Sequence, residues 1–153
     1  MDEINQLVVF TLNIEYAIPV SKMQEIITLP PVITPLPEAP EYIVGLMNLR
    51  GAAIPIVDLN LKFKTHSVPD ILYSYCILIK LPEQTIGILV ENVSELLKLP
   101  ADSIKPTPPV VTGIAAQYLS GIGLIGPRII YLLDVEKIFT EGDKNILREL
   151  TEK

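Results

Sequence analysis

Residues 43–63 read IVGLMNLRGAAIPIVDLNLKF and residues 119–139 read LSGIGLIGPRIIYLLDVEKIF, two stretches that align with each other without a gap. Identical residues recur at matching places in the two stretches: Gly45 and Gly121, Ile54 and Ile130, Asp58 and Asp134, Phe63 and Phe139. Self-similarity of this kind indicates an internal repeat. The chain is therefore expected to contain two units of one design.

The repeat extends upstream of both stretches. Further residues match in pairs: Val20 and Val90, Glu25 and Glu95, Leu29 and Leu99, Pro30 and Pro100. The pattern Ile-x-Pro-x-Pro also occurs twice, at residues 33–37 and at residues 104–108. Two units are too few for a solenoid, which stacks three or more repeats. The sequence therefore predicts two similar small domains that pack against each other.

Most of the apolar segments are short and rich in β-branched residues, which is typical of strands. The predicted strands are Leu7–Thr11, Ile54–Leu59, Tyr75–Leu81, Thr85–Val90 and Ile129–Leu133. Pro55 suggests an edge or a bulge, and residues 82–84 suggest a hairpin turn. About five strands per unit favour small barrels, so we predict a mostly-β protein made of two five-stranded β-barrels in tandem.

The unit boundaries follow from the repeat. One unit is expected over about residues 15–75, and the other over about 76–140 together with an N-terminal strand at 6–13. Ser21–Ile27 suggests a short helical turn that Ser21 caps, and the proline-rich segments 33–40 and 104–109 suggest stiff connections. Ile146, Leu147 and Leu150 stand at helical spacing, which predicts an amphipathic C-terminal helix at about 142–152.

Composition excludes several classes of protein. The chain has 153 residues, of which 49% are hydrophobic and 20% are charged, and its net charge is −6. A negative chain without a basic run is a poor binder of nucleic acid. One Cys and one His exclude an internal disulfide and a Cys/His zinc site. The surplus of apolar residues suggests surface that is left over for partners.

We expect a cytoplasmic protein that does not insert into the membrane. Its N-terminus is acidic and lacks the regions of a signal peptide. The segment 106–127 carries no charge and is long enough to span a bilayer, but it contains prolines and glycines that would break a helix. We interpret it as an irregular segment that is buried or lines an interface.

The motifs that could carry chemistry are weak, so we expect no catalytic group, cofactor or metal. Gly121, Gly123 and Gly126 form a G-x-G-x-x-G pattern, but a β-like run follows where a dinucleotide site needs a helix. These glycines are interpreted as turn residues. His66 stands in a polar loop, and Cys76 stands within an apolar strand that would make its thiol inert.

Three charged positions draw more specific expectations. Asp58 and Asp134 are repeat partners at strand ends, where we expect each carboxylate to cap nearby backbone N–H groups. Arg50 is the lone charge between Ile43 and Val57, so it must pair with a carboxylate or carbonyls, or face a partner. Glu25 is its candidate mate. The pair either serves folding as a buried ion pair or lies at a binding surface, and the two roles are compatible.

These residues closely resemble the CheW-like family of chemotaxis coupling proteins. The motif NLRG at residues 48–51 and the strand IPIVDL at residues 54–59 carry the resemblance most specifically. VFTL at 9–12, KMQEI at 22–26, GILV at 87–90 and YLSGIG at 118–123 extend it from about Gln6 to Phe139. The resemblance implies two SH3-like barrels in tandem, in agreement with the repeat, and a free-standing adaptor.

The family resemblance also implies partners. Members join the regulatory domain of the chemotaxis histidine kinase to the cytoplasmic tips of methyl-accepting receptors, so this chain would be recruited to membrane receptor arrays, where weak self-association is also possible. By the same resemblance, the expected partner-binding residues are Met23, Glu25, Gly45, Arg50, Val93, Leu96 and Val110. Val93 and Leu96 match the receptor groove between the barrels, and Val110 matches a second kinase contact.

Three other functions stay open. The chain could be an adaptor of the same fold in another kinase pathway, such as surface motility. It could be a β-barrel sensor that binds a small apolar ligand between the barrels. It could be a small hydrolase, which would depend on His66 as its base.

Overall fold

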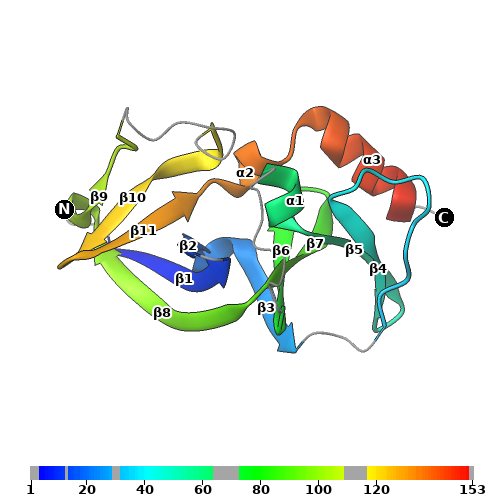
Figure 1. Ribbon diagram of the computed structural model, residues 1–153, viewed down its shortest axis with the longest axis horizontal. Helices are drawn as coiled ribbons and strands as arrows, with labels where there is room; N and C mark the ends of the chain where they lie inside the picture. The colour runs from blue at the N-terminus through cyan, green and yellow to red at the C-terminus, as the bar shows by residue number, and fades with distance from the viewer. Residues whose placement is uncertain (1–3, 13, 29–31, 64–72, 109–116, 152–153) are drawn as a thin grey trace.

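The computed structural model describes residues 4–12, 14–28, 32–63, 73–108 and 117–151 (Figure 1). In chain order its elements are β1 (Ile4–Leu12), β2 (Ile14–Pro19), the 3-10 turn η1 (Val20–Lys22), β3 (Met23–Thr28), β4 (Ile43–Leu49), β5 (Ala52–Val57), α1 (Leu59–Phe63), β6 (Tyr75–Leu81), β7 (Gln84–Val90), β8 (Asn92–Pro100), η2 (Ala101–Ser103), β9 (Ile104–Lys105), β10 (Leu119–Ile125), β11 (Arg128–Leu133), α2 (Val135–Ile138) and α3 (Glu141–Thr151). The predicted mostly-β class is confirmed.

The strands form two sheets that lie side by side along the long axis of the molecule (Figure 1). The six-stranded sheet has the order β8-β1-β2-β11-β10-β9, and the five-stranded sheet has the order β3-β6-β7-β5-β4. Each sheet contains one parallel pair among antiparallel ones, β11 with β2 and β5 with β7. The two orders match strand for strand, from β3 and β8 at one edge to β4 and β10 near the other, which confirms the internal repeat.

Each repeat unit gives its first hairpin to the sheet of the other unit. The hairpin β1-β2 precedes β3 in the chain but pairs with β8 and β11. The hairpin β6-β7 precedes β8 but pairs with β3 and β5. The predicted division near residue 75 is therefore corrected, because residues 75–90 complete the five-stranded sheet and β2 belongs to the six-stranded one. Hydrophobic pattern reveals that a strand is buried, but it does not reveal which strand it pairs with.

Neither sheet is a closed five-stranded barrel, which corrects the predicted architecture. The edge strands β3 and β8 each pair on one side, with β6 and β1. At the opposite edge of the six-stranded sheet, β9 contributes two residues that pair with β10. Its equivalent in the five-stranded sheet is a single bridge between Thr34 and Leu46. The proline-rich connections thus supply short pairing segments, and their prolines prevent longer ones.

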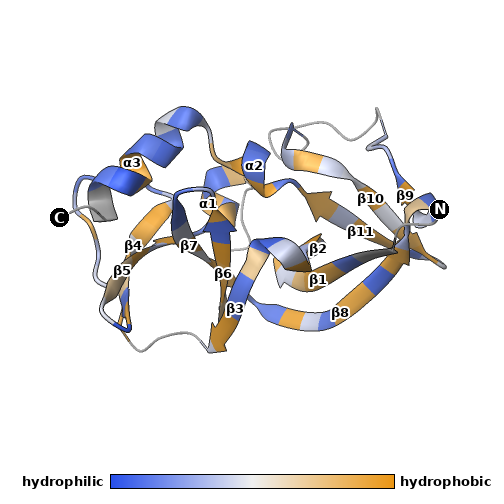
Figure 2. Cartoon of the chain, turned by 180° about the vertical axis from the view of Figure 1, so that it is seen from behind, coloured by the Kyte–Doolittle hydropathy of each residue, from blue (hydrophilic) through white to orange (hydrophobic). Residues whose placement is uncertain are grey.

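Buried apolar side chains of the described residues gather in three clusters. The largest, the shared core, contains residues from both sheets, such as Phe10, Phe63 and Leu133. The other two clusters lie on the opposite faces of the six-stranded and the five-stranded sheets, around Val9 and around Ile56. Strand β8 mixes hydrophobic and hydrophilic residues, and α3 is mostly hydrophilic apart from its buried face (Figure 2). The shared core joins the sheets into one body.

Three local predictions are wrong. The helical turn predicted at residues 21–27 is limited to η1, which ends at Lys22. The chain continues as strand β3, because the Met23–Thr28 segment pairs with β6 and its β-branched residues suit a strand. Gly121 and Gly123 lie within strand β10, and of the three glycines only Gly126 occupies a turn. Pro55 is not at a sheet edge, but it precedes the residues Ile56 and Val57 that pair with β7, so its missing N–H costs no bond there.

Candidate functional site

Arg50 and Glu25 form the expected ion pair. Arg50 Nη2 donates to Glu25 Oε1 at 2.5 Å, across the open side of the five-stranded sheet between the β4-β5 turn and edge strand β3. The side chains are 68% and 33% exposed, respectively. The pair is therefore not the buried folding pair that was one of the two alternatives. An exposed ion pair contributes little to stability, whereas its position makes the guanidinium available to a partner.

The turn that carries Arg50 has a strained backbone. Arg50 has φ of +49° and Gly51 has φ of +87°, and the Gly51 N–H donates to Asn48 Oδ1 at 3.0 Å. Asn48 therefore stabilises the turn with its side chain. A residue with a Cβ pays about 1 kcal/mol or more in the left-handed region. An arginine in a place that suits glycine is an observation that points to function.

The predicted residues Met23, Val93 and Leu96 lie on the edge strands β3 and β8. Met23 and Val93 are half-buried and pack against the shared core, while Leu96 is 67% exposed. Each strand contains a bulge, at Gln24 just after Met23 and at Ser94 just after Val93. The repeat thus places apolar side chains at the same points of the two edges.

Gly45 has a structural role that the sequence did not reveal. It is buried in β4, and a Cβ on it would come within 2.2 Å of the carbonyl oxygen of Thr34. Gly121, its repeat partner, would meet the carbonyl oxygen of Lys105 at 2.6 Å in the same way. The glycines allow the proline-rich segments to pair with β4 and β10. Whether Gly45 also contacts a partner stays a prediction.

Sequence reasoning missed a second ion cluster, in the six-stranded sheet. Arg128, at the start of β11, donates to Glu15 Oε1 and Oε2 at 3.2 and 2.8 Å and to Glu95 Oε1 at 2.7 Å. These hydrogen bonds raise the pKa of Arg128. Glu95 is the repeat partner of Glu25, which was the available signal. Arg128 was missed because it does not align with Arg50. In the repeat alignment, Gly126 is the residue that matches Arg50.

Asp58 and Asp134 cap short helices, as predicted. Asp58 Oδ1 accepts from the backbone N–H groups of Asn60 and Leu61 at 2.9 and 3.2 Å, and Asp134 Oδ1 accepts from Glu136 N at 2.9 Å. Asp58 Oδ2 also accepts from the Tyr73 hydroxyl at 2.9 Å. Burial and this bond raise the pKa of Tyr73 to about 12. These carboxylates therefore serve the fold.

Helix α3, which confirms the predicted C-terminal helix, is tied to the five-stranded side of the molecule. Asp143 accepts from Lys62 Nζ at 2.7 Å, from the Tyr42 hydroxyl and from Thr140 N at 3.0 Å. Burial alone would raise the pKa of Asp143, but these hydrogen bonds outweigh it, and the pKa is lowered. Leu147 is fully buried against the shared core. The helix therefore contributes to the fold through both charge and packing.

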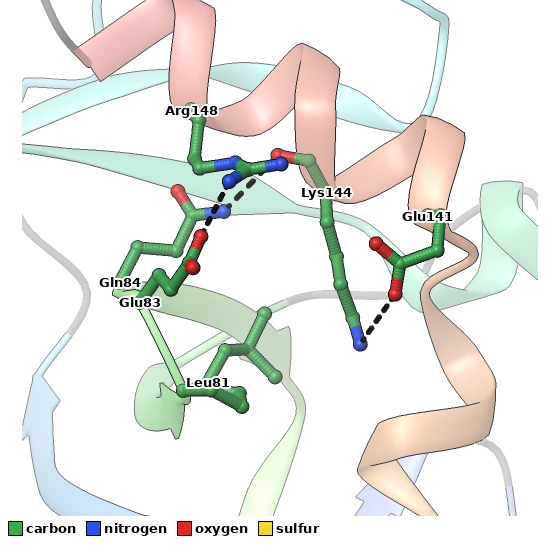
Figure 3. Close-up of a pocket in the computed structure, with 7 residues that line it drawn as sticks. Leu81, Glu83, Gln84, Glu141, Lys144 and Arg148 are labelled. Atoms are coloured by element: carbon green, nitrogen blue, oxygen red, sulfur yellow. Dashed lines mark hydrogen bonds and ion pairs between the residues drawn. The ribbon is translucent and has the colours of Figure 1, made fainter.

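A small cavity of about 160 Å³ lies between the β6-β7 turn and α3 (Figure 3). Charged side chains surround it, and Arg148 pairs there with Glu83 at 2.5 Å. Gln84 Oε1 is a buried oxygen without a hydrogen-bond partner at this place, which a water molecule could supply. Its charged rim does not suit the small apolar ligand of the sensor hypothesis, and the shared core fills the space between the sheets.

The remaining candidates are Cys76, a possible metal cluster and His66. Burial raises the pKa of the Cys76 thiol to about 12, in line with an inert side chain. The part of the chain that the structure describes contains no group of three His, Cys, Asp or Glu side chains that could hold a metal. Within the same residues, no helix combines the length and the apolar character needed to cross a membrane. His66 and Val110 lie outside the described residues.

Two sheets related by a repeat carry exposed ion pairs and apolar side chains on their edge strands, features that suit a protein of the binding class. Comparison with known proteins makes this specific. The family model "CheW-like domain" matches residues 6–143. The chain belongs to the CheW-like family, as its sequence motifs predicted.

Named relatives cover nearly all of the chain. It is 37% identical over 139 residues to a "Chemotaxis protein CheW" of Klebsiella aerogenes, covering 90% of this chain and 83% of the relative. It is 29% identical over 154 residues to a protein of that name from Treponema pallidum, with 97% and 90% coverage. The crystal structure of the "scaffolding protein TtCheW" from Thermoanaerobacter tengcongensis superposes with a TM-score of 0.81 at 29% identity, over 92% of this chain and 96% of that one.

Proposed function

We propose that this chain is a non-enzymatic adaptor of chemotaxis, which joins the regulatory domain of a histidine kinase to the cytoplasmic tips of chemoreceptors. Family membership and the relatives named for chemotaxis and scaffolding support this role. The observation that carries the proposal is the β4-β5 turn. It holds Arg50 exposed and in a strained conformation beside edge strand β3, a costly arrangement that folding alone does not require.

The two partners use separate surfaces in this proposal. The kinase domain contacts the five-stranded side around Met23, Glu25 and Arg50. The receptor tip, which is a helical hairpin, packs against apolar residues of β8, mainly Val93 and Leu96. Exposed apolar side chains on an edge strand suit the apolar face of a helix. Each contact alone is small, so strength comes from many such contacts in a receptor array.

The fold needs no catalytic group for this role. Its mechanism is positional, because one rigid body with two surfaces fixes the distance between kinase and receptor. The shared core supplies that rigidity, since it contains side chains from both sheets and from α1, α2 and α3. A change in a receptor can then reach the kinase through a body that does not bend between the sheets.

Calorimetric titration of the purified chain into the kinase regulatory domain, and separately into a soluble receptor-tip fragment, tests the proposal. We expect micromolar 1:1 binding to each. Met23→Ala should weaken kinase binding, and Leu96→Asp should weaken receptor binding. Ile129→Asp is the matched control for Leu96, because Ile129 is an exposed apolar residue of the same sheet, at 52% against 67%. A folded chain that binds neither partner at hundreds of micromolar would contradict the proposal.

A further inference from the structure

Arg128 ties the edge strand β8 to the middle of its sheet. Its guanidinium bonds Glu15 on β2 with two nitrogens and Glu95 on β8 with one, so a single side chain at the start of β11 links three strands. A guanidinium can serve two carboxylates at once because its five N–H donors point in fixed directions. The arginine on β11 therefore contacts β8, a strand that does not pair with β11.

Edge strand β8 has ladder hydrogen bonds on one side, so a side-chain tie adds to what holds its register. It pairs with β1 on one side. A strand that pairs on one side has half of the ladder hydrogen bonds of an inner strand, and its register is correspondingly easier to shift. The bulge at Ser94, which stands between the pairs Val9–Glu95 and Phe10–Val93, interrupts the ladder further.

The bulge decides which side chains of β8 lie on the same face of the sheet. Residues paired across two strands share a face of the sheet. Val93 pairs with Phe10 and Leu96 pairs with Val8, and both partners belong to the shared core, whereas Glu95 pairs with Val9 of the opposite cluster. Val93 and Leu96, three residues apart, therefore share one face, and Glu95 between them faces the other way. Without the bulge Val93 and Glu95 would share a face.

We infer that Arg128 is a positioning residue for the receptor-binding edge, which acts by holding Glu95 on one face of the sheet so that Val93 and Leu96 stay together on the other, at the edge of the shared core. The inference rests on the proposed function for the role of these two residues. The same device occurs at the other edge, where the bulge at Gln24 separates Met23 from Glu25, and Glu25 pairs with Arg50. The repeat thus uses one arrangement to present apolar residues at both edges.

Two glutamate variants test the inference, because both bond Arg128 but only one lies on β8. Glu95→Ala releases β8, whereas Glu15→Ala, the matched control with the same charge change, leaves β8 tied. Glu95→Ala should weaken receptor-tip binding about three- to fivefold, while kinase-domain binding of both variants stays within about twofold of wild type. Glu95→Gln should restore receptor binding, because its amide oxygen can still accept a hydrogen bond from Arg128.

Other outcomes overturn the inference. If Glu95→Ala binds the receptor tip like wild type, Glu95 does not position the edge. If both alanine variants lose both partners in step with their thermal unfolding midpoints, the cluster serves general stability. If wild type binds neither partner, the proposed function fails, and amide hydrogen exchange then tests the positioning without a partner. It should accelerate in β8 in Glu95→Ala and stay unchanged in Glu15→Ala, and equal exchange in the two variants would overturn the inference.

Discussion

The two repeat units solve one structural problem in two ways at the β4-β5 turn and the β10-β11 turn. In both, an arginine from the hairpin reaches a glutamate on the facing edge strand, Arg50 to Glu25 and Arg128 to Glu95. Arg128 stands within its strand, has two carboxylate partners and is 38% exposed. Arg50 occupies the turn itself, has φ of +49° and is 68% exposed.

The repeat alignment explains what this difference means. Gly126, which aligns with Arg50, has φ of +54°, so the left-handed place exists in both turns and holds glycine in one of them. The β10-β11 turn shows that the glutamate can be held without strain and with a better-paired arginine. The strain and exposure at Arg50 are therefore not needed to hold the edge strand. We attribute them to contact with a partner.

The largest expected effect on stability concerns a feature that the two repeat units share, the glycine in β4 and in β10. Gly45→Ala should lower the free energy of unfolding by about 2–4 kcal/mol, because the new methyl group would collide with a backbone carbonyl that side-chain movement cannot relieve. Gly121→Ala should cost a similar amount, since its contact is longer, at 2.6 Å against 2.2 Å, but its φ of +159° also disfavours a side chain. Urea denaturation measures both. Equal and negligible losses would show that the proline-rich segments do not hold this pairing.

The next effect sharpens a second contrast between the units. Tyr42 donates to Asp143 of α3, while its repeat partner Tyr118 is buried and stacks on Phe63. Asp143→Asn should therefore lower stability by about 1–3 kcal/mol at pH 7, because Lys62 would lose its carboxylate in a site where its side chain is 11% exposed. Chemical denaturation of the variant and of wild type at pH 7 measures this.

The same variant predicts a pH dependence. The folded state lowers the pKa of Asp143, so it favours the charged carboxylate. The resulting stability is fully present above about pH 5 and is lost as the pH falls through the unfolded value of about 3.9 toward the lower folded value. Wild type should thus lose more stability between pH 6 and pH 3 than Asp143→Asn. Parallel curves for the two proteins would contradict this account of α3.

Smaller effects separate the two arginines. Arg50→Met should lower the free energy of unfolding by about 0.5 kcal/mol or less, as is usual for an exposed pair. Arg128→Met should lower it more, because two glutamates lose their common partner. The comparison needs both variants in one denaturation series, at low and at high salt. A larger loss for Arg50→Met would reverse the roles that we assign to the two turns.

The smallest expected change in stability is that of Arg50→Gly. Glycine relieves the left-handed backbone, and this gain of up to about 1 kcal/mol offsets the lost ion pair. The thermal unfolding midpoint should therefore stay within the error of measurement or rise. Gly126→Ala, which introduces the same strain into the other turn, where a Cβ would meet no neighbour, is the matched opposite and should destabilise.

Much of this architecture could be predicted from the sequence. The repeat, the strands, the Arg50–Glu25 pair and the caps at Asp58 and Asp134 follow from local pattern and from matched positions. The exchange of hairpins could not be predicted, because it depends on which strands pair. The bulges at Gln24 and Ser94 were hidden for the same reason, since a bulge is defined by the register of the neighbouring strand.

The candidate site was predicted only in part. The family motif led to Arg50 because its arginine stands in the turn sequence itself. Arg128 escaped because it reaches the matching glutamate from a position two residues further along the repeat, and spacing in the chain does not reveal that reach. Gly45 was assigned to binding, whereas the structure shows why a side chain does not fit there. The structural role of Gly45 does not exclude the predicted binding role, and sequence pattern does not separate the two.

The measurement that tests the central claim most directly is the calorimetric titration of wild type and Arg50→Gly with the kinase regulatory domain and with the receptor tip, alongside their thermal unfolding. We predict that Arg50→Gly keeps the unfolding midpoint of wild type and loses at least about tenfold in affinity for one or both partners. If the variant is as stable as wild type and binds both partners equally well, the strained arginine serves neither contact, and the account of the β4-β5 turn is wrong.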